Sequence, residues 1–553
     1  MRAVLFIALL ALSGSAHALT PSELDTLIDR IWATHGITPA PTSSDSEFFR
    51  RVYLDLAGEP PSVEETVNFL TSNEPNKRAK AIEQLLATRE YGEHHGRVWT
   101  NLILEGRVLK RRFPRERFDS YLADSFNKNK PFDDLVKELI AVEGSSADNG
   151  ATFLILSHEG KPEDLTSTSA RLFLGTQLRC AQCHDDKFGP WKQEQFWGFA
   201  AFFARVETRP EKSPLAKRPE SFLVTDRPRG EAIIPEDGAT PSFKDLPPEE
   251  RRKARMALER EMRTHPVRPA FLGQPVDLHP RDHRRKALAE RIVRAPDNLF
   301  ARTQVNRVWA EMFGAGLIEP LDDLYGKTAG DWEPVLQALA SHFIESGHRM
   351  KSLYALIANT KAYQLTSEGQ TESNSLREYF ARARLRPLSP EALFQTILKT
   401  TNVESTASAT RKARLEQEKQ RYLERFVFVF GNDEVEKSTA FEGTIPQALM
   451  MMNDPLIERG LAPLGGTTLH RILESSQSVS ERIRFLYLGA LSREPSVAEM
   501  KAAQRFLVEA SPEPSGDARA IRPRDRLARM REAEAYQDLL WSLMNSAEFL
   551  YNH

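Results

Sequence analysis

The chain has 553 residues, of which 75 are Lys or Arg and 77 are Asp or Glu, so its formal net charge is −2. This balance excludes a strongly basic surface for nucleic acid or an anionic membrane, and we expect neither as a partner. Hydrophobic residues make up 41% of the chain. The length predicts about two to four domains with real cores.

The first 18 residues have the pattern of a secretory signal peptide. Arg2 precedes an apolar run from Ala3 to Leu12, and Ala16-His17-Ala18 fits an A-x-A cleavage site. The apolar run is too short for a permanent membrane anchor, and no later stretch is long and apolar enough to span a bilayer. We therefore expect an exported, periplasmic protein that is cleaved after Ala18 and has no transmembrane anchor in the mature chain.

Residues 19–206 are predicted to form a first helical domain. Leu24, Leu27, Ile28 and Ile31 recur at helical spacing, and Ser62-x-x-Glu65 is a capping box that starts a further helix. A Gly/Ser/Asp/Asn loop follows from Gly144 to Gly150. No convincing strand pattern appears, so this half is predicted to be all-α.

The two cysteines of the chain lie in one motif, Cys180-Ala181-Gln182-Cys183-His184. C-x-x-C-H is the pattern of covalent haem attachment, in which two thiols add to the porphyrin vinyl groups and the imidazole becomes an axial iron ligand. We therefore expect one covalent haem c held by Cys180, Cys183 and His184. Two alternatives remain: a redox dithiol or local disulfide, and a metal site without haem that has three protein ligands.

Large aromatic residues follow the motif and are suited to form a porphyrin wall, although they could equally pack against one another. They are Trp191, Phe196, Trp197, Phe199, Phe202 and Phe203. The second axial ligand of a haem iron is unknown from the sequence. The candidates are Met450, Met451, Met452, His158, His94, His95 and His283.

Residues 207–280 are predicted to be a Pro- and charge-rich connection that is partly extended. Phe222 and Val224 could pair with Ile233 and Ile234 in a short hairpin, and residues 248–262 form a charged helix. Residues 281–553 again have mainly helical spacing and form the second domain. The predicted fold class is therefore mainly α, with two packed helical domains joined by this connection.

Several stretches of the first half resemble the cytochrome-associated domain of unknown function 1549 found in planctomycetes and their relatives. These stretches are 50–58, 127–133, 173–185, Trp191 and 200–203. The second half resembles the planctomycete-type domain of unknown function 1553, which usually follows the first. Its matching stretches are 268–273, 305–309, 313–317, 388–391, 446–449, 487–488, 493–495 and 545–553.

The resemblance implies an exported protein, encoded with exported hydrolases and suspected in polysaccharide or surface biology. Many relatives carry a separate N-terminal cytochrome c module, which this chain lacks. Relatives commonly have a second His shortly after the motif, whereas this chain continues His184-Asp185-Asp186-Lys187. A second ligand shared with the relatives is therefore in doubt.

Two functions of different classes fit these patterns. The first is an exported c-type haem protein with an electron-transfer or oxidoreductase role and a periplasmic redox partner. The second is a non-redox helical scaffold or binding protein with a Cys/His metal or disulfide clamp, accessory to exported hydrolases. The sequence has no nucleotide-binding loop and no H-E-x-x-H motif, and it identifies no catalytic residue.

Overall fold

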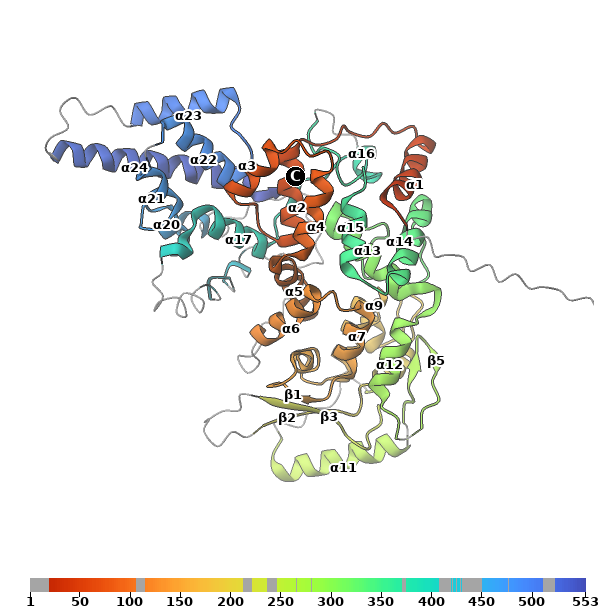
Figure 1. Ribbon diagram of the computed structural model, residues 1–553. Coiled ribbons are helices and arrows are strands. Elements are labelled where there is room, and N and C mark those ends of the chain that lie inside the picture. The colour runs from red at the N-terminus through yellow and green to blue at the C-terminus, as the bar shows by residue number, and fades with distance from the viewer. Residues whose placement is uncertain are drawn as a thin grey trace, which may run out of the picture.

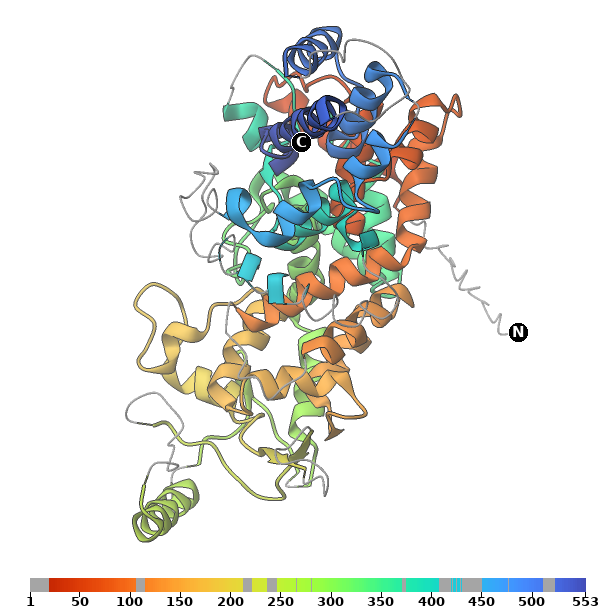
Figure 2. The same ribbon diagram turned by 90° about the vertical axis from the view of Figure 1, so that its left-hand side faces the viewer.

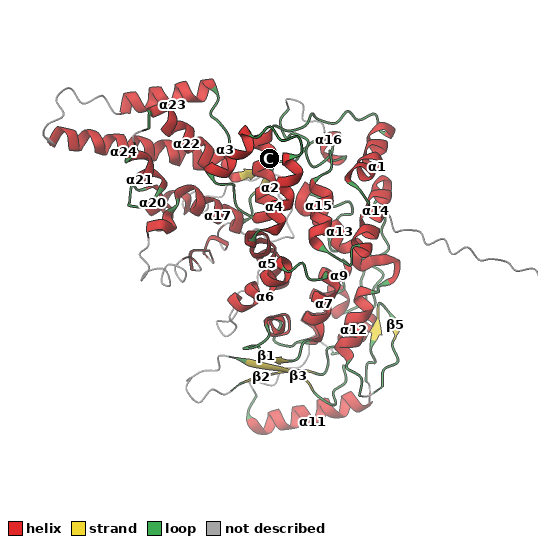
Figure 3. Cartoon of the chain, viewed as in Figure 1, coloured by secondary structure: helices red, strands yellow, loops and turns green. Residues whose placement is uncertain are grey.

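The computed structural model describes residues 19–553 except 106–114, 212–220, 236–245, 265, 280, 370–373, 407–418, 420, 424, 428, 430–449, 476 and 511–522. The predicted signal peptide and the stretch 446–449 lie outside the described residues. Helices dominate the described part, and the strands are short (Figure 3). The predicted mainly α class is therefore confirmed.

A first hydrophobic core extends from Leu24 to Ala381 and joins helices of both predicted domains. Its helices are α1 (Pro21–Thr34), α2 (Asp45–Ala57), α3 (Val63–Thr71), α4 (Lys77–Ala87), α5 (Arg89–Leu104), α6 (Arg115–Asn127), α7 (Phe132–Ala141), α8 (Phe153–Ser157), α9 (Pro162–Leu174), α10 (Gln193–Ala200), α12 (Arg284–Val293), α13 (Leu299–Phe313), α14 (Glu333–Glu345), α15 (Met350–Ala358) and α16 (Asn374–Glu378). Some of them begin with a capping box, including the one predicted at Ser62 and Glu65.

A second hydrophobic core extends from Leu393 to Phe549. Its helices are α17 (Pro390–Thr401), α20 (Pro455–Leu461), α21 (Thr468–Leu473), α22 (Val479–Leu491), α23 (Val497–Ala510), α24 (Pro523–Met544) and α25 (Ala547–Leu550). They lie together at the upper left of Figure 1, where α23 and α24 project side by side. Hydrophobic packing thus changes from one unit to the next between residues 381 and 393, inside the segment 281–553.

A small antiparallel sheet contains β1 (Gly144–Ser145), β3 (Phe222–Asp226) and β2 (Val206–Pro210) in that order, so the connection pairs with a strand of the segment 19–206, which was expected to be all-α. Phe222 and Val224 therefore pair with residues 206–210, whereas the hairpin partners expected for them were Ile233 and Ile234. The buried Val224 side chain faces the first core, which fixes this pairing. The charged helix α11 (Pro248–Thr264) projects at the lower end of Figures 1 and 2. After it, β4 (Ala270–Phe271) pairs with β5 (Gln274–Pro275) in an antiparallel ladder.

Two arginines of α2 fasten the first core to distant parts of the chain. Arg50 donates to the Ala490 carbonyl at 2.9 Å, and Arg51 donates to the carbonyls of Tyr363 at 2.6 Å and His553 at 2.8 Å. Both guanidinium groups are buried, so these bonds replace the water that the charges lose. The segment 50–58, which carries the resemblance, therefore acts as a structural joint.

The C-terminal strand completes the same joint. Strand β7 (Tyr551–Asn552) pairs with β6 (Arg386–Pro387) in an antiparallel ladder, and Figure 1 shows the C-terminus beside α2. Among the residues that the structure describes, no helix has the length and apolar character needed to cross a membrane.

Candidate functional site

A cavity of about 3780 Å³ runs between the two cores and is the candidate binding cleft. Its walls come from α5, α9, α13, α15, β6 and the C-terminal residues. Charged and aromatic side chains are among its lining, including Glu105, Arg307, Glu311, Tyr354 and Arg384. A small-molecule pocket usually measures roughly 300–1,000 Å³, so this cleft has room for an extended ligand.

The cysteine motif lies at the rim of this cleft on an exposed turn. A 3₁₀ turn, Arg179–Gln182, carries Cys180, which lines the cleft, and both cysteines are free and exposed. Neighbouring side chains hold the turn through its backbone: Trp197 donates to the Gln182 carbonyl at 3.0 Å and Gln193 to the Cys183 carbonyl at 3.0 Å. The thiols take no part in this attachment.

His184 is bonded within its own turn. Its ring is exposed, and its Nδ1 donates to the backbone oxygen of Asp185 at 2.7 Å. Within the described part of the chain, the ligand atoms of two sets of His, Asp or Glu residues lie close enough together to hold a metal ion. Cys180, Cys183 and His184 do not form such a set.

The prediction of one covalent haem c is not supported by this geometry and is corrected here. The predicted porphyrin wall is closed, because its six aromatic side chains are all at most 5% exposed and belong to the first core. Phe196 packs edge-on against Trp197, and Phe199 against Phe202. These rings contact one another and the protein, so they leave no apolar face beside the exposed turn for a porphyrin.

The predicted distal ligands have other roles. Both ring nitrogens of His158 are bonded, Nδ1 to the Leu154 carbonyl at 2.9 Å and Nε2 to the Thr168 hydroxyl at 2.8 Å. His283 caps α12 by accepting from the Lys286 backbone N–H. The three methionines lie in or beside the second core, where Met450 and Met451 are buried and Met452 is 61% exposed.

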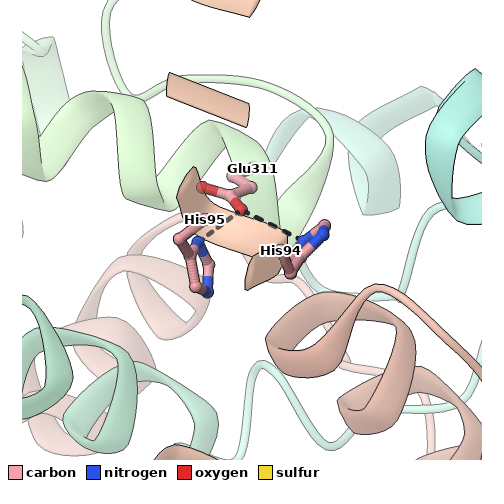
Figure 4. Close-up of side chains that lie close together, drawn as sticks. All are labelled: His94, His95 and Glu311. Atoms are coloured by element: carbon pink, nitrogen blue, oxygen red, sulfur yellow. Dashed lines mark ion pairs between the residues drawn. The ribbon is translucent and has the colours of Figure 1, made fainter. Parts of the chain in front are cut away.

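His94 and His95 instead form a cluster with Glu311 beneath the wall of the cleft (Figure 4). The Glu311 Oε1 atom lies 3.5 Å from His95 Nδ1 and 4.0 Å from His94 Nε2. Both imidazoles come from α5, while the carboxylate comes from α13 and lines the cleft. Tyr354 donates a 2.6 Å hydrogen bond to the other carboxylate oxygen, Oε2.

Burial sets the charge of this cluster. Burial, with a smaller effect from the Arg97 guanidinium, lowers the pKa of His94 to about 3. Burial likewise depresses the pKa of His95 well below its ordinary value. Burial also raises the pKa of Glu311 to about 7, although the hydrogen bond from Tyr354 acts in the opposite direction. The two rings are therefore neutral at neutral pH.

Polar atoms of this cluster lack hydrogen-bond partners. Both ring nitrogens of His95 and the Glu311 Oε1 atom are shielded from solvent and unbonded. The His95 ring lies between Tyr91 and Tyr354, at centroid distances of 4.5 Å from each. Buried polar atoms are nearly always bonded in native structures, so these three need an explanation.

Gly58 makes room for the cluster. A Cβ atom at this position would lie 2.2 Å from His94 Nδ1, and the backbone φ of Gly58 is +68°. Only glycine takes this left-handed conformation without steric cost. The end of the segment 50–58 is therefore shaped around the His94 ring.

Asp55 holds the neighbouring wall of the cleft in place. It accepts two hydrogen bonds of 2.9 Å from Arg386, one of 2.7 Å from the Tyr363 hydroxyl and one of 2.7 Å from Asn552. Its side chain is 5% exposed. One buried carboxylate thus joins α2, the first core and strand β7.

Sequence reasoning considered His94 and His95 only as haem ligands and did not single out Glu311. The available signal was weak: two adjacent histidines on a helix, and a glutamate 217 positions later on another amphipathic helix. Nothing in spacing joins residues so far apart. Asn306 and Trp309, which lie in the matching stretch 305–309, are buried in α13, where Asn306 bonds the Ile318 backbone.

Two family models match the chain. The domain described as a protein of unknown function, DUF1549, matches residues 23–208, and the one described as DUF1553 matches residues 284–507. Searches of curated proteins and of solved structures found no match. The chain therefore belongs to the planctomycete-type proteins in which a domain of unknown function 1549 is followed by a domain of unknown function 1553.

Proposed function

We propose that the protein is an exported, non-redox binding protein whose cleft takes an extended anionic ligand, an acidic polysaccharide. The observation that carries the proposal is the cleft of about 3780 Å³ between the two cores. The signal-peptide pattern of residues 1–18 supports export. The resemblance to domains suspected in polysaccharide biology supports the ligand class.

One arginine of the cleft is placed to bind an anionic group, within a lining that holds twelve Asp or Glu and eight Arg. Arg384 lines the cleft, its Nε is buried without a hydrogen bond, and the structure gives it no ion pair within the described chain. Burial lowers its pKa, and the like charge of Arg377 adds to this effect. A guanidinium in such surroundings gains from a carboxylate or sulfate, which it binds through paired N–H groups.

The rim turn is proposed as a reversible disulfide clamp. Residues three apart on a 3₁₀ turn have Cα atoms about 6 Å apart, within the range of a disulfide. Cys180 and Cys183 are exposed thiols at the edge of the cleft. In an oxidising periplasm their closure stiffens the rim without needing the buried core.

Binding of polygalacturonate and of neutral dextran to the exported protein tests the main proposal. We expect salt-sensitive binding of polygalacturonate, no binding of dextran, and at least tenfold weaker binding by Arg384→Gln. Arg89→Gln is the matched control, because Arg89 is exposed and lies outside the cleft lining. Equal binding of both polymers, or an undiminished affinity of Arg384→Gln, contradicts the proposal.

The clamp has its own readout. In the unreduced exported protein, alkylation should leave both cysteines unmodified, because they form a disulfide. After reduction, both cysteines should be alkylated, and mass spectrometry distinguishes the two results. Free thiols in the exported protein contradict the clamp and leave the binding proposal standing.

A further inference from the structure

We propose that His94, His95 and Glu311 form a binding site for a divalent transition metal, with Zn²⁺ as the representative ion. This site goes beyond the proposed polysaccharide binding and does not depend on it. It is also separate from the cysteine turn, because none of its residues belongs to that turn. Two imidazoles and one carboxylate are a donor set suited to zinc. Zinc sites with an open coordination position commonly have three protein ligands of this kind.

Distances support the site. The ligand atoms of His94, His95 and Glu311 all lie within 4.8 Å of one another. Zinc bonds of roughly 2.0–2.2 Å place tetrahedral ligand atoms about 3.3 Å apart. Side-chain rotations that move atoms by about 1 Å therefore suffice to close the three donors around an ion. Figure 4 shows the two rings on either side of the carboxylate, both facing its Oε1 atom.

A bound ion would account for two of the three unbonded atoms. His95 is fully buried, and its two ring nitrogens and Glu311 Oε1 have no hydrogen-bond partner. A cation between them would satisfy His95 Nδ1 and Glu311 Oε1 together. Without an ion, the structure keeps a buried imidazole unsatisfied, which destabilises the fold.

The surroundings fix the donors in the way metal sites require. Tyr354 donates to Glu311 Oε2 at 2.6 Å, which orients the carboxylate and leaves Oε1 for the ion. Tyr91 and Tyr354 hold the His95 ring from two sides. Gly58 leaves the space that the His94 ring occupies. The donors are thus positioned by three separate elements of the first core.

An ion at this site would be reached from the cleft. Glu311 and Tyr354 line the cleft wall, whereas both histidines lie behind it on α5. Three protein ligands leave a fourth coordination position for water or for an oxygen of a bound ligand. The metal would then give the cleft a second point of attachment for an anionic group, apart from Arg384.

The test uses the full mature chain carrying Cys180→Ser and Cys183→Ser, so that the rim thiols cannot supply metal ligands. After chelator treatment and removal of any affinity tag, Zn²⁺ is titrated by calorimetry and Co²⁺ by visible absorption. We expect one equivalent of Zn²⁺ and the d–d absorption of Co²⁺ bound to nitrogen and oxygen. In the same background, Glu311→Gln should weaken Zn²⁺ binding more than about 100-fold, since even supporting residues change affinity 10–100-fold.

Three further variants distinguish the loss of a metal ligand from a general effect on the fold. Tyr354→Phe should weaken binding by about tenfold or more through the orientation of the carboxylate. His342→Gln changes another buried histidine, which bonds Ser352, and should leave binding unchanged. If Glu311→Gln does not fold, His94→Gln takes its place, with circular dichroism as the check on folding. No stoichiometric binding by the thiol-free chain, or equal affinity in Glu311→Gln and His94→Gln, overturns the site.

Discussion

The exposed turn of Cys180, Cys183 and His184 and the buried cluster of His94, His95 and Glu311 hold metal-ligating residues in opposite surroundings. The turn has a compact sequence motif, yet its side chains face solvent and do not converge. The cluster has almost no motif, yet three elements of the core bring its donors together. Burial and convergence, more than sequence spacing, indicate where a ligand would gain most from binding.

We expect the largest loss of stability when the buried charge of Asp55, beside the cluster, is removed. Asp55→Ala would leave Arg386 buried without its carboxylate partner, and we expect a loss of about 3–5 kcal/mol in the free energy of unfolding. Urea denaturation measures it. The control Asp29→Ala removes an exposed partner of Lys361 and should cost less than about 1 kcal/mol. A loss of equal size in both variants would show that burial of Asp55 is unimportant.

The space around His94 gives the next largest effect. Gly58→Ala meets both a left-handed backbone and the His94 ring, so we expect a loss of about 3 kcal/mol. Gly36→Ala has a similar φ of +63° but nothing within 4 Å of the new Cβ, and should cost only about 1 kcal/mol. The difference between the two variants, measured by chemical denaturation, isolates the contact with His94. Equal losses would mean that the ring moves aside freely.

A half-exposed charge cluster in the second core provides an intermediate case. Arg493 bonds Glu499 and Glu548, and its hydrogen bonds lower the pKa of Glu499 to about 2. The folded protein therefore keeps Glu499 charged where the unfolded chain, with a pKa near 4.5, takes up a proton. This stabilisation is fully present above pH 4.5 and is lost as the pH falls through 2.

Arg493→Gln should accordingly cost about 1–2 kcal/mol near pH 7 and less near pH 3.5. Unfolding curves of both proteins at the two pH values give the difference. A cost that stays constant with pH would assign the loss to packing of the arginine stem rather than to its charge.

The exposed turn should show the smallest effect. Cys180→Ser with Cys183→Ser changes two solvent-facing atoms, so under reducing conditions we expect less than about 0.5 kcal/mol. Melting curves with and without a chelator measure it. A loss above about 2 kcal/mol, or a chelator effect that only the wild type shows, would mean that the turn holds a structural metal.

The helices could be predicted from the sequence, whereas the contacts that join distant segments could not. Apolar spacing and the capping box at Ser62 predicted helices correctly, because these signals act within a few residues. The pairing of β3 was predicted wrongly, since its partners at 144–145 and 206–210 are chosen by the core that Val224 contacts. Local spacing carries no information on such tertiary choices.

The site was harder to predict for the same reason. The adjacent Arg50 and Arg51 lie between the apolar residues Phe48, Phe49 and Val52 of one helix, which is a signal for buried charge that sequence reasoning did not use. Glu311 gave no comparable signal. The aromatic residues after the cysteine motif were read as a porphyrin wall, whereas their burial in the core shows the simpler use of such rings.

The joint between α2 and residues 551–553 links the start of the chain to its end, which bears on the order of synthesis. Asp55 and its partner Asn552 are 497 positions apart. At roughly 5–20 residues per second, a ribosome that has made α2 needs on the order of half a minute or more to supply this partner. Until then Asp55 lacks the Asn552 amide and Arg51 lacks the His553 carbonyl, so the joint at α2 is completed only when the end of the chain has been made.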